Sequence, residues 1–126
     1  MISPCRAFPA WRIVFEGRGD RFMPQEEINA LKDCFVKALD PLRVYLFGSY
    51  AYGTPDQDSD FDFYIVVDDS QTDTLGLTQR AYSACSEMKR HPVDILVGTK
   101  SRFEARKHRP TIENEVFNKG VLLYGA

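Results

Sequence analysis

The sequence has few of the features that mark several large classes of protein. Its three cysteines, Cys5, Cys34 and Cys85, are far apart and include no C-x-x-C pair, which disfavours a zinc site or a disulfide scaffold and fits a reducing compartment. No apolar run approaches the roughly 18 residues of a membrane span, and the first residues lack the basic-then-apolar pattern of a signal peptide. We therefore expect a soluble, cytoplasmic protein with no membrane partner.

A large net charge is also absent. Sixteen Lys and Arg against 18 Asp and Glu leave a formal charge of -2, which argues against a protein held on nucleic acid mainly by bulk positive charge. The charges are separated along the chain. All charged residues in 54–73 are aspartates, whereas most charged residues in 89–109 are Lys or Arg. This separation predicts either an acidic metal-binding rim facing a basic anion-binding rim, or two ordinary solvated faces.

The length and composition predict one domain. The chain has 126 residues, of which 44% are hydrophobic, and this suffices for a single packed core. We expect residues 1–22 to be a peripheral extension and residues 23–126 to be the domain. Apolar spacing and turn signals predict strands over 42–47, 61–67, 93–97 and 121–124. They also predict one helix from Pro24 to near Asp40 and a second from Leu75 to about Arg90. A third helix begins with a capping box at Ser101–Glu104, is interrupted at Pro110 and stops at Gly120.

The region 46–67 carries the most specific chemistry. It contains an apolar strand, the turn residues Gly48 and Ser49, a polar loop, and a second strand that begins with Asp60 and Asp62. Two residues apart in an extended segment, these two carboxylates leave the same face of a sheet. Gly48 and Ser49 end the first strand where backbone N–H groups and a hydroxyl can meet phosphate oxygens.

A third carboxylate, Asp94, stands inside the predicted strand 93–97 among apolar residues. A charge inside a strand is costly unless it is paired or bound to metal, so Asp94 is either ion-paired with a neighbour or part of one site with Asp60 and Asp62. Such carboxylates suit Mg²⁺, which takes oxygen ligands and substrate phosphates. Two ions of this kind can support in-line displacement at phosphorus.

Two other motifs match only in part. Gly48 and Gly53 have the glycine spacing of a P-loop, but Thr54 and Pro55 follow where Lys and Ser or Thr are required. The run of aspartates from Asp56 imitates an EF-hand without its glycine and its bidentate glutamate. Both interpretations are therefore set aside.

The remaining pattern consists of Gly48-Ser49, a spacer of ten residues, Asp60 and Asp62, and the later strand residue Asp94. This pattern resembles the signature of the DNA polymerase beta superfamily of nucleotidyltransferases, most of all its minimal (MNT-type) branch. The resemblance covers about residues 24–124. It implies an α+β fold with a mixed sheet packed with helices. It also implies that Asp60 and Asp62 bind both Mg²⁺ ions and the nucleotide phosphates, that Asp94 binds the catalytic metal and helps to deprotonate the acceptor hydroxyl, and that Gly48 and Ser49 hold the triphosphate.

The function that follows is transfer of NMP, AMP by the resemblance, from an NTP such as ATP to a hydroxyl. The resemblance also implies a partner, because minimal members pair with a helical HEPN-type protein in toxin–antitoxin modules, where the transferase is the antitoxin and modifies its toxin. A nucleic-acid acceptor and a homo-oligomer stay open. The alternative is a non-catalytic module that binds a nucleotide or a partner and neutralises that partner by contact.

Several other side chains have an ordinary structural explanation beside a functional one. Basic residues of the segment 100–109 either steer triphosphate or an acceptor, or form a solvated helix face: Arg102, Arg106, Lys107 and Arg109. The histidines, His91 and His108, fit surface positions better than a ligand role. Tyr50 and Tyr52 either stack on a base or fill the loop.

Overall fold

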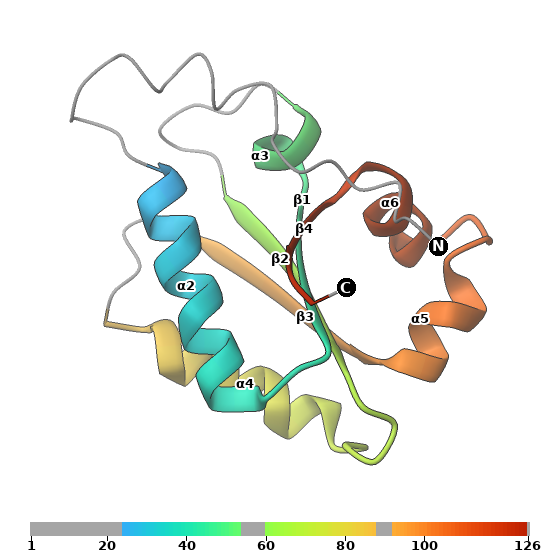
Figure 1. Ribbon diagram of the computed structural model, residues 1–126, viewed down its shortest axis with the longest axis horizontal. Coiled ribbons are helices and arrows are strands. Elements are labelled where there is room, and N and C mark those ends of the chain that lie inside the picture. Colours follow the sequence, from blue (N-terminus) through green and yellow to red (C-terminus); the bar gives the residue numbers. More distant parts are fainter. Residues whose placement is uncertain (1–23, 54–59, 88–91, 126) are drawn as a thin grey trace.

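The structure is a computed structural model that describes residues 24–53, 60–87 and 92–125. Its centre is a four-stranded sheet in the order β3-β2-β1-β4 (Figure 1). The strands are β1 (Arg43–Phe47), β2 (Phe61–Val67), β3 (Val93–Thr99) and β4 (Val121–Tyr124). β1 pairs antiparallel with both β2 and β4, whereas β2 and β3 are parallel. The predicted α+β domain with a mixed sheet is confirmed.

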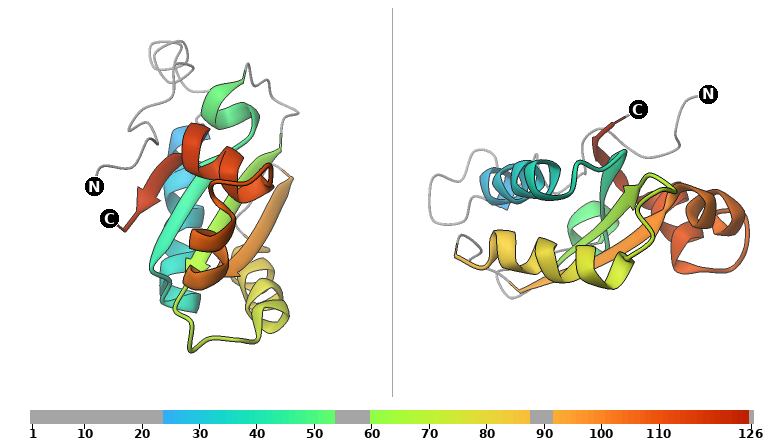
Figure 2. Two further views of the ribbon diagram at one scale, coloured as in Figure 1. Left: turned by 90° about the vertical axis from the view of Figure 1, so that its right-hand side faces the viewer. Right: turned by 90° about the horizontal axis from the view of Figure 1, so that it is seen from below.

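One face of the sheet is covered by α2 (Pro24–Leu39) and α4 (Thr74–Cys85), as Figure 2 shows. The stripe Ile28, Leu31, Phe35 and Leu39, spaced as the turns of a helix, is fully buried against the strands. The rings of Phe35 and Phe63 meet edge to face with centroids 5.0 Å apart. This layer is the larger part of the hydrophobic core.

The other face is only partly covered. Helices α5 (Lys100–Arg106) and α6 (Ile112–Lys119) lie over it, and Phe103 and Val116 pack against Tyr45 and Tyr64. Every residue of β2 except Asp62 is buried, so the prediction that both faces of this strand are covered is confirmed. On β3, in contrast, Asp94 and Leu96 are exposed on the face that α5 and α6 partly cover. An open strip of sheet therefore remains over β3.

Three local predictions were wrong. A short helix, α3 (Ser49–Tyr52), stands where a loop was expected. α4 ends at Cys85, before Arg90, because the N–H and hydroxyl of Ser86 both donate to the Ser83 carbonyl and close the last turn. The cap of α5 is Thr99, whose hydroxyl accepts from the Arg102 N–H, so the expected capping box is not formed.

The bounds of α2, β2, α6 and β4 agree with the sequence, whereas β1 begins one residue late, β3 continues to Thr99 and α5 ends at Arg106, before Pro110. α2 ends at Leu39, where Asp40 takes a positive φ of 50°. Thr111 caps α6 after Pro110, and Gly120 ends it. Residues 1–23 lie outside the described residues, so the peripheral extension over 1–22 stays a prediction. Among the residues that the structure does describe, no helix combines the length and the apolar character needed to cross a membrane.

Candidate active site

The parallel pairing of β2 and β3 brings two of the predicted carboxylates together. In its register Asp62 lies directly opposite Asp94, and both leave the partly covered face of the sheet. Asp60 is exposed and immediately precedes β2. The pKa of Asp62 is raised from 3.8 to about 6 by burial above all, together with the negative charges of Asp94 and Asp60 and a side-chain hydrogen bond with Asp94. The negative charges of the three carboxylates therefore interact electrostatically.

Gly48 fixes the turn that lies against this pair. β1 ends at Phe47, whose register partner is Asp62, and Gly48 then adopts a φ of +80°. A Cβ atom at this position would stand 2.1 Å from Oδ2 of Asp62. The positive φ and the close approach both require glycine. The turn continues into α3, whose Ala51 N–H donates to the Gly48 carbonyl at 2.9 Å, so Ser49 starts its helix beside the carboxylates.

We expect Gly48→Ala to damage the site more than the fold. The new methyl group would force Asp62 away from Asp94 and would place a side chain at positive φ, which costs about 1–2 kcal/mol. Thermal unfolding should show a loss of that size, and calorimetry should show a loss of ATP binding of at least about tenfold, as displacement of a binding group costs more than 1.4 kcal/mol. Gly76→Ala, in the first turn of α4, is the control and should leave ATP binding unchanged. Normal ATP affinity in Gly48→Ala would remove Gly48 from the site.

The donor chemistry fits a hard divalent cation. Asp62 and Asp94 are oxygen donors that repel each other, and no described Lys or Arg forms an ion pair with either carboxylate. Within the described part of the chain, however, no three or more Asp, Glu, His or Cys side chains form a group that could hold a metal ion. The register thus unites Asp62 and Asp94, and Asp60 stands beside them without completing such a group.

The two tyrosines of α3 differ in their surroundings. Tyr50 is fully buried and meets the ring of Phe61 edge to face at 4.6 Å, so it fills the core. Tyr52 is exposed and its hydroxyl donates to Glu115 of α6. The ammonium of Lys119 lies 5.6 Å from the centre of the Tyr52 ring. α6 is therefore tied to the short helix that begins at Ser49.

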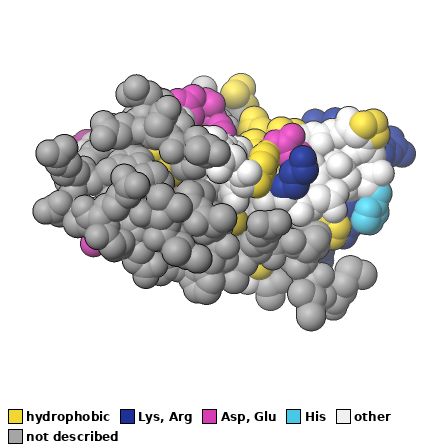
Figure 3. Space-filling view, turned by 90° about the horizontal axis from the view of Figure 1, so that it is seen from above, with side chains coloured by type: hydrophobic (Ala, Val, Ile, Leu, Met, Phe, Trp, Pro, Cys, Tyr) yellow, Lys and Arg dark blue, Asp and Glu magenta, His cyan; other side chains and the backbone are white. Residues whose placement is uncertain are grey.

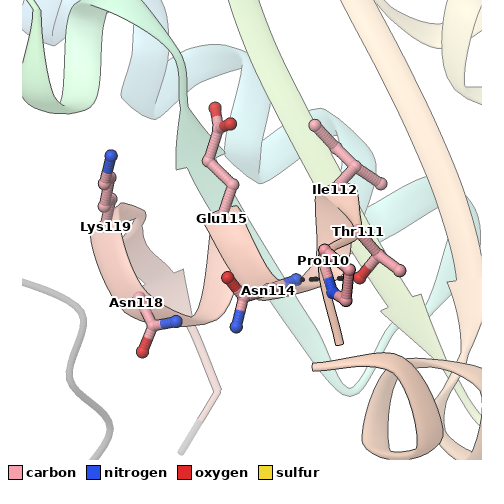
Figure 4. A pocket seen from close by; sticks show the side chains of 7 residues that line it. All are labelled: Pro110, Thr111, Ile112, Asn114, Glu115, Asn118 and Lys119. Carbon is pink, nitrogen blue, oxygen red and sulfur yellow. Dashed lines mark hydrogen bonds between the residues drawn. The ribbon is translucent and has the colours of Figure 1, made fainter. Parts of the chain in front are cut away.

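A hollow of about 360 Å³ lies beside α6 and its preceding turn (Figure 4). Its lining includes Ile112, Glu115 and Lys119, and the Asn114 N–H donates to the Thr111 hydroxyl at 3.2 Å on its wall. The predicted site residues of β2 and β3 are not among those that line it. We therefore assign the hollow no part in the chemistry of the carboxylates.

The basic segment 100–109 begins at the end of β3 opposite to Asp94, because β3 runs from Val93 to Thr99 before α5 starts. Lys107 forms an ion pair with Glu104 at 2.6 Å, its side chain is only 16% exposed, and its ammonium lies 4.6 Å from the centre of the Phe117 ring, so this residue has a structural role and is not part of a solvated face. His108 is exposed and its ring meets Phe117; His91 lies outside the described residues. Figure 3 shows basic side chains gathered at the end of the molecule where a histidine is also exposed.

Sequence reasoning missed a buried polar network on the same face of the sheet as Asp62 and Asp94. Glu113 of α6 is only 2% exposed, and it accepts a hydrogen bond from the Tyr64 hydroxyl at 2.8 Å and one from Arg106 Nε at 3.0 Å. Arg102 Nε lies 3.7 Å from the same carboxylate. Burial raises the pKa of Glu113, but the hydrogen bonds from Tyr64 and Arg106 and the charge of Arg106 outweigh it and hold the pKa below its ordinary value. A glutamate inside an amphipathic helix gives no sequence signal of such burial.

Glu113→Gln should destabilise the fold by about 2 kcal/mol near neutral pH, because it removes a buried charge from its donors. The folded-state pKa lies below the ordinary 4.5, so the stabilisation is fully present above that value and is lost as the pH falls through the folded-state pKa. Urea unfolding of both proteins between pH 3 and 8 should show a difference that is constant above about pH 5 and shrinks below about pH 4.5. Glu87→Gln, in the exposed turn after α4, should differ little from the wild type. A difference that grows at acid pH would contradict this account.

A mixed sheet with helices on both faces, a Gly-Ser turn and facing carboxylates on neighbouring strands are the features that the resemblance to nucleotidyltransferases implies. The family model of the nucleotidyltransferase domain matches residues 28–123, and the chain belongs to this family. The resemblance seen in the motif is thereby confirmed. No protein with a curated description matches the chain.

Solved structures agree on the fold. A candidate nucleotidyltransferase from Sulfolobus solfataricus superposes with a TM-score of 0.53 at 19% identity, over 79% of this chain and 78% of that one. The structure of the tri-AMPylated HEPN toxin of Shewanella oneidensis in complex with MNT antitoxin gives a TM-score of 0.50 at 21% identity, over 82% of this chain and 74% of that one. At this identity the likeness shows the fold of the chain.

Proposed function

We propose that this nucleotidyltransferase moves NMP, AMP in particular, from a Mg²⁺-bound NTP to a hydroxyl on a partner protein and releases pyrophosphate. The observation that carries the proposal is the register that sets Asp62 against Asp94 beside the Gly48 turn. The MNT antitoxin of the Shewanella complex, crystallised with an AMPylated HEPN toxin, supports AMP as the transferred group and a HEPN-type protein as the partner. The chain would then be the antitoxin of a toxin–antitoxin module.

Each predicted site residue has a distinct task in this proposal. Asp60 and Asp62 bind the metal ions and through them the nucleotide phosphates, and Gly48 and Ser49 hold the triphosphate at the end of β1. Asp94 orients the acceptor hydroxyl and takes up its proton as the new bond to phosphorus forms. Mg²⁺, when bound, neutralises charge that develops on the phosphoryl oxygens and on the leaving pyrophosphate.

The acceptor is expected to come from another macromolecule. Most of this small domain is needed to cover the sheet, and the strip over β3 is open, with Asp94 and Leu96 exposed. A small-molecule acceptor is normally enclosed on most sides, whereas an open strip beside reacting groups suits a docked partner that brings its own hydroxyl.

The test is to incubate the purified chain with ATP and Mg²⁺, alone and together with candidate HEPN-type partner proteins. We expect little turnover alone, and with the partner a mass increase of one AMP residue on a hydroxyl side chain of that partner. Rapid transfer to a small metabolite without any protein would overturn the protein acceptor. Full neutralisation of the partner by a variant that cannot transfer AMP would instead favour the non-catalytic binding module.

A further inference from the structure

The buried carboxylate of Glu113 lies beside two arginines, although one would neutralise its charge. Arg106 already pairs with it through an Nε–H at 3.0 Å, and Arg102 stands beside it at 3.7 Å with a side chain 59% exposed. One carboxylate next to two guanidinium groups leaves a net positive charge of about one at this place, with most of the Arg102 side chain in solvent. The two guanidinium groups can therefore bind a second anion.

The two arginines are on the side of α5 that faces β3. Phe103 of α5 packs into the core. Helical spacing then places Arg102 and Arg106 on one side of Phe103 and Glu104 on the other side. Glu104 pairs with Arg43 of β1. Because β1 and β3 flank β2 on opposite sides, the arginine pair lies toward β3.

Tyr64 gives a second indication of the same position. Its hydroxyl, which donates to Glu113, lies over Gly98 of β3, where an added Cβ atom would approach it to 2.3 Å. On this face β3 presents Asp94, then Leu96, then Gly98. The strip therefore has carboxylates at one end, the 42% exposed Leu96 in the middle, and at the other end Gly98, about 13 Å from Asp94 at 3.3 Å per residue. Over Gly98 the Tyr64 hydroxyl leads to Glu113 and its two arginines.

The direction of the reaction assigns the β3 side of the site to the acceptor. In an in-line displacement the attacking oxygen approaches phosphorus opposite the leaving group. If the pyrophosphate is held at Gly48 and Ser49, next to β1, then the acceptor arrives from the side of β3. This step rests on the function proposed above.

We propose that Arg102 and Arg106, held by Glu113, form an oxyanion-binding pair for a carboxylate of the acceptor protein. The attacking hydroxyl then lies at Asp94, an apolar part of the acceptor lies on Leu96, and the carboxylate stands about four residues away along an extended segment, at 3.3 Å per residue. The formal charge of -2 disfavours nucleic acid, whose binding requires a more basic surface, whereas the local positive charge of the arginine pair suits a single carboxylate.

The experiment follows the Nε–H signals of the arginines by NMR in the full chain. Two capped five-residue peptides are titrated, one with serine first and glutamate fifth, and its twin with glutamine fifth. We expect the glutamate peptide to shift the Arg102 and Arg106 signals and to bind about fivefold more tightly than its twin, as for one partly exposed charge-assisted pair. In Arg102→Gln, which leaves the Arg106–Glu113 bond in place, the preference should fall below about twofold.

Arg80→Gln is the matched control, because Arg80 is exposed on α4, which covers the opposite face, and the variant loses the same charge. It should keep the preference for the glutamate peptide. Equal binding of both peptides to the wild type, or an equal loss in Arg80→Gln, would overturn the proposal. So would weaker ATP binding in Arg102→Gln, which would assign the pair to the nucleotide, or displacement of the peptide by a single-stranded RNA. These readouts are binding measurements, so their failure is distinct from a failure of AMP transfer to the partner.

Discussion

Asp94→Asn is expected to lose AMP transfer by at least about a thousandfold while its ATP affinity stays within about threefold of the wild type. The amide keeps the size and the hydrogen-bonding reach of the carboxylate, but it cannot take up the proton of the acceptor hydroxyl. Because Asp94 is exposed and opposite Asp62, we expect its replacement to affect a bound ligand and not the core. Single-turnover transfer of labelled AMP to the partner protein measures the first quantity, and calorimetry with ATP and Mg²⁺ measures the second.

Asp33→Asn supplies a control for the loss of one aspartate charge. Asp33 is 71% exposed on α2 and pairs only with its neighbour Lys32 among the contacts of described residues. This variant should transfer AMP at the wild-type rate. If Asp94→Asn were as active as Asp33→Asn, Asp94 would be a structural residue of the edge strand and the proposed chemistry would lose its base.

Asp60→Ala and Asp62→Ala should each abolish Mg²⁺-dependent ATP binding, a loss of at least about a hundredfold. Neither variant should unfold the domain. The pKa of Asp62 is raised to about 6 by burial and by the charges of Asp94 and Asp60, so at neutral pH its ionised form destabilises the metal-free fold. Asp62→Ala should therefore raise the free energy of unfolding at pH 7.5 without metal by about 1 kcal/mol, after allowance for solvent screening.

The two measurements for these variants are calorimetry with ATP in the presence and absence of Mg²⁺, and urea unfolding in a chelator. Asp69→Ala is a useful comparison, because Asp69 is a carboxylate outside the site that accepts from the Ser101 N–H at 2.8 Å. It should lose some stability and keep its ATP affinity. Unchanged ATP affinity in both Asp60→Ala and Asp62→Ala would contradict metal binding by these carboxylates.

Much of the fold is written in local patterns that the sequence displays. The run from Phe61 to Val67 is apolar except for Asp62, and it became a central strand in which every other residue is buried. The stripe from Ile28 to Leu39 became the buried side of α2, and Gly120 ended α6 as expected. Periodicity, turn residues and caps act over a few residues, so a reader of the sequence can recover them. The motif of Gly48, Ser49 and the aspartates likewise identified the family.

What the sequence by itself determined is the four strands and the longer helices, the family and the candidate chemistry; the short helix α3 was not among them. The tertiary structure decided which side chains meet. The register of β2 and β3 joins Asp62 to Asp94, although 31 intervening residues separate them. The contact of Glu113 with Tyr64 and Arg106 depends on how α6 and α5 pack over the sheet, and so does the exposure of Leu96. Pairings between distant segments depend on the free energy of the whole core, which no local window of sequence contains.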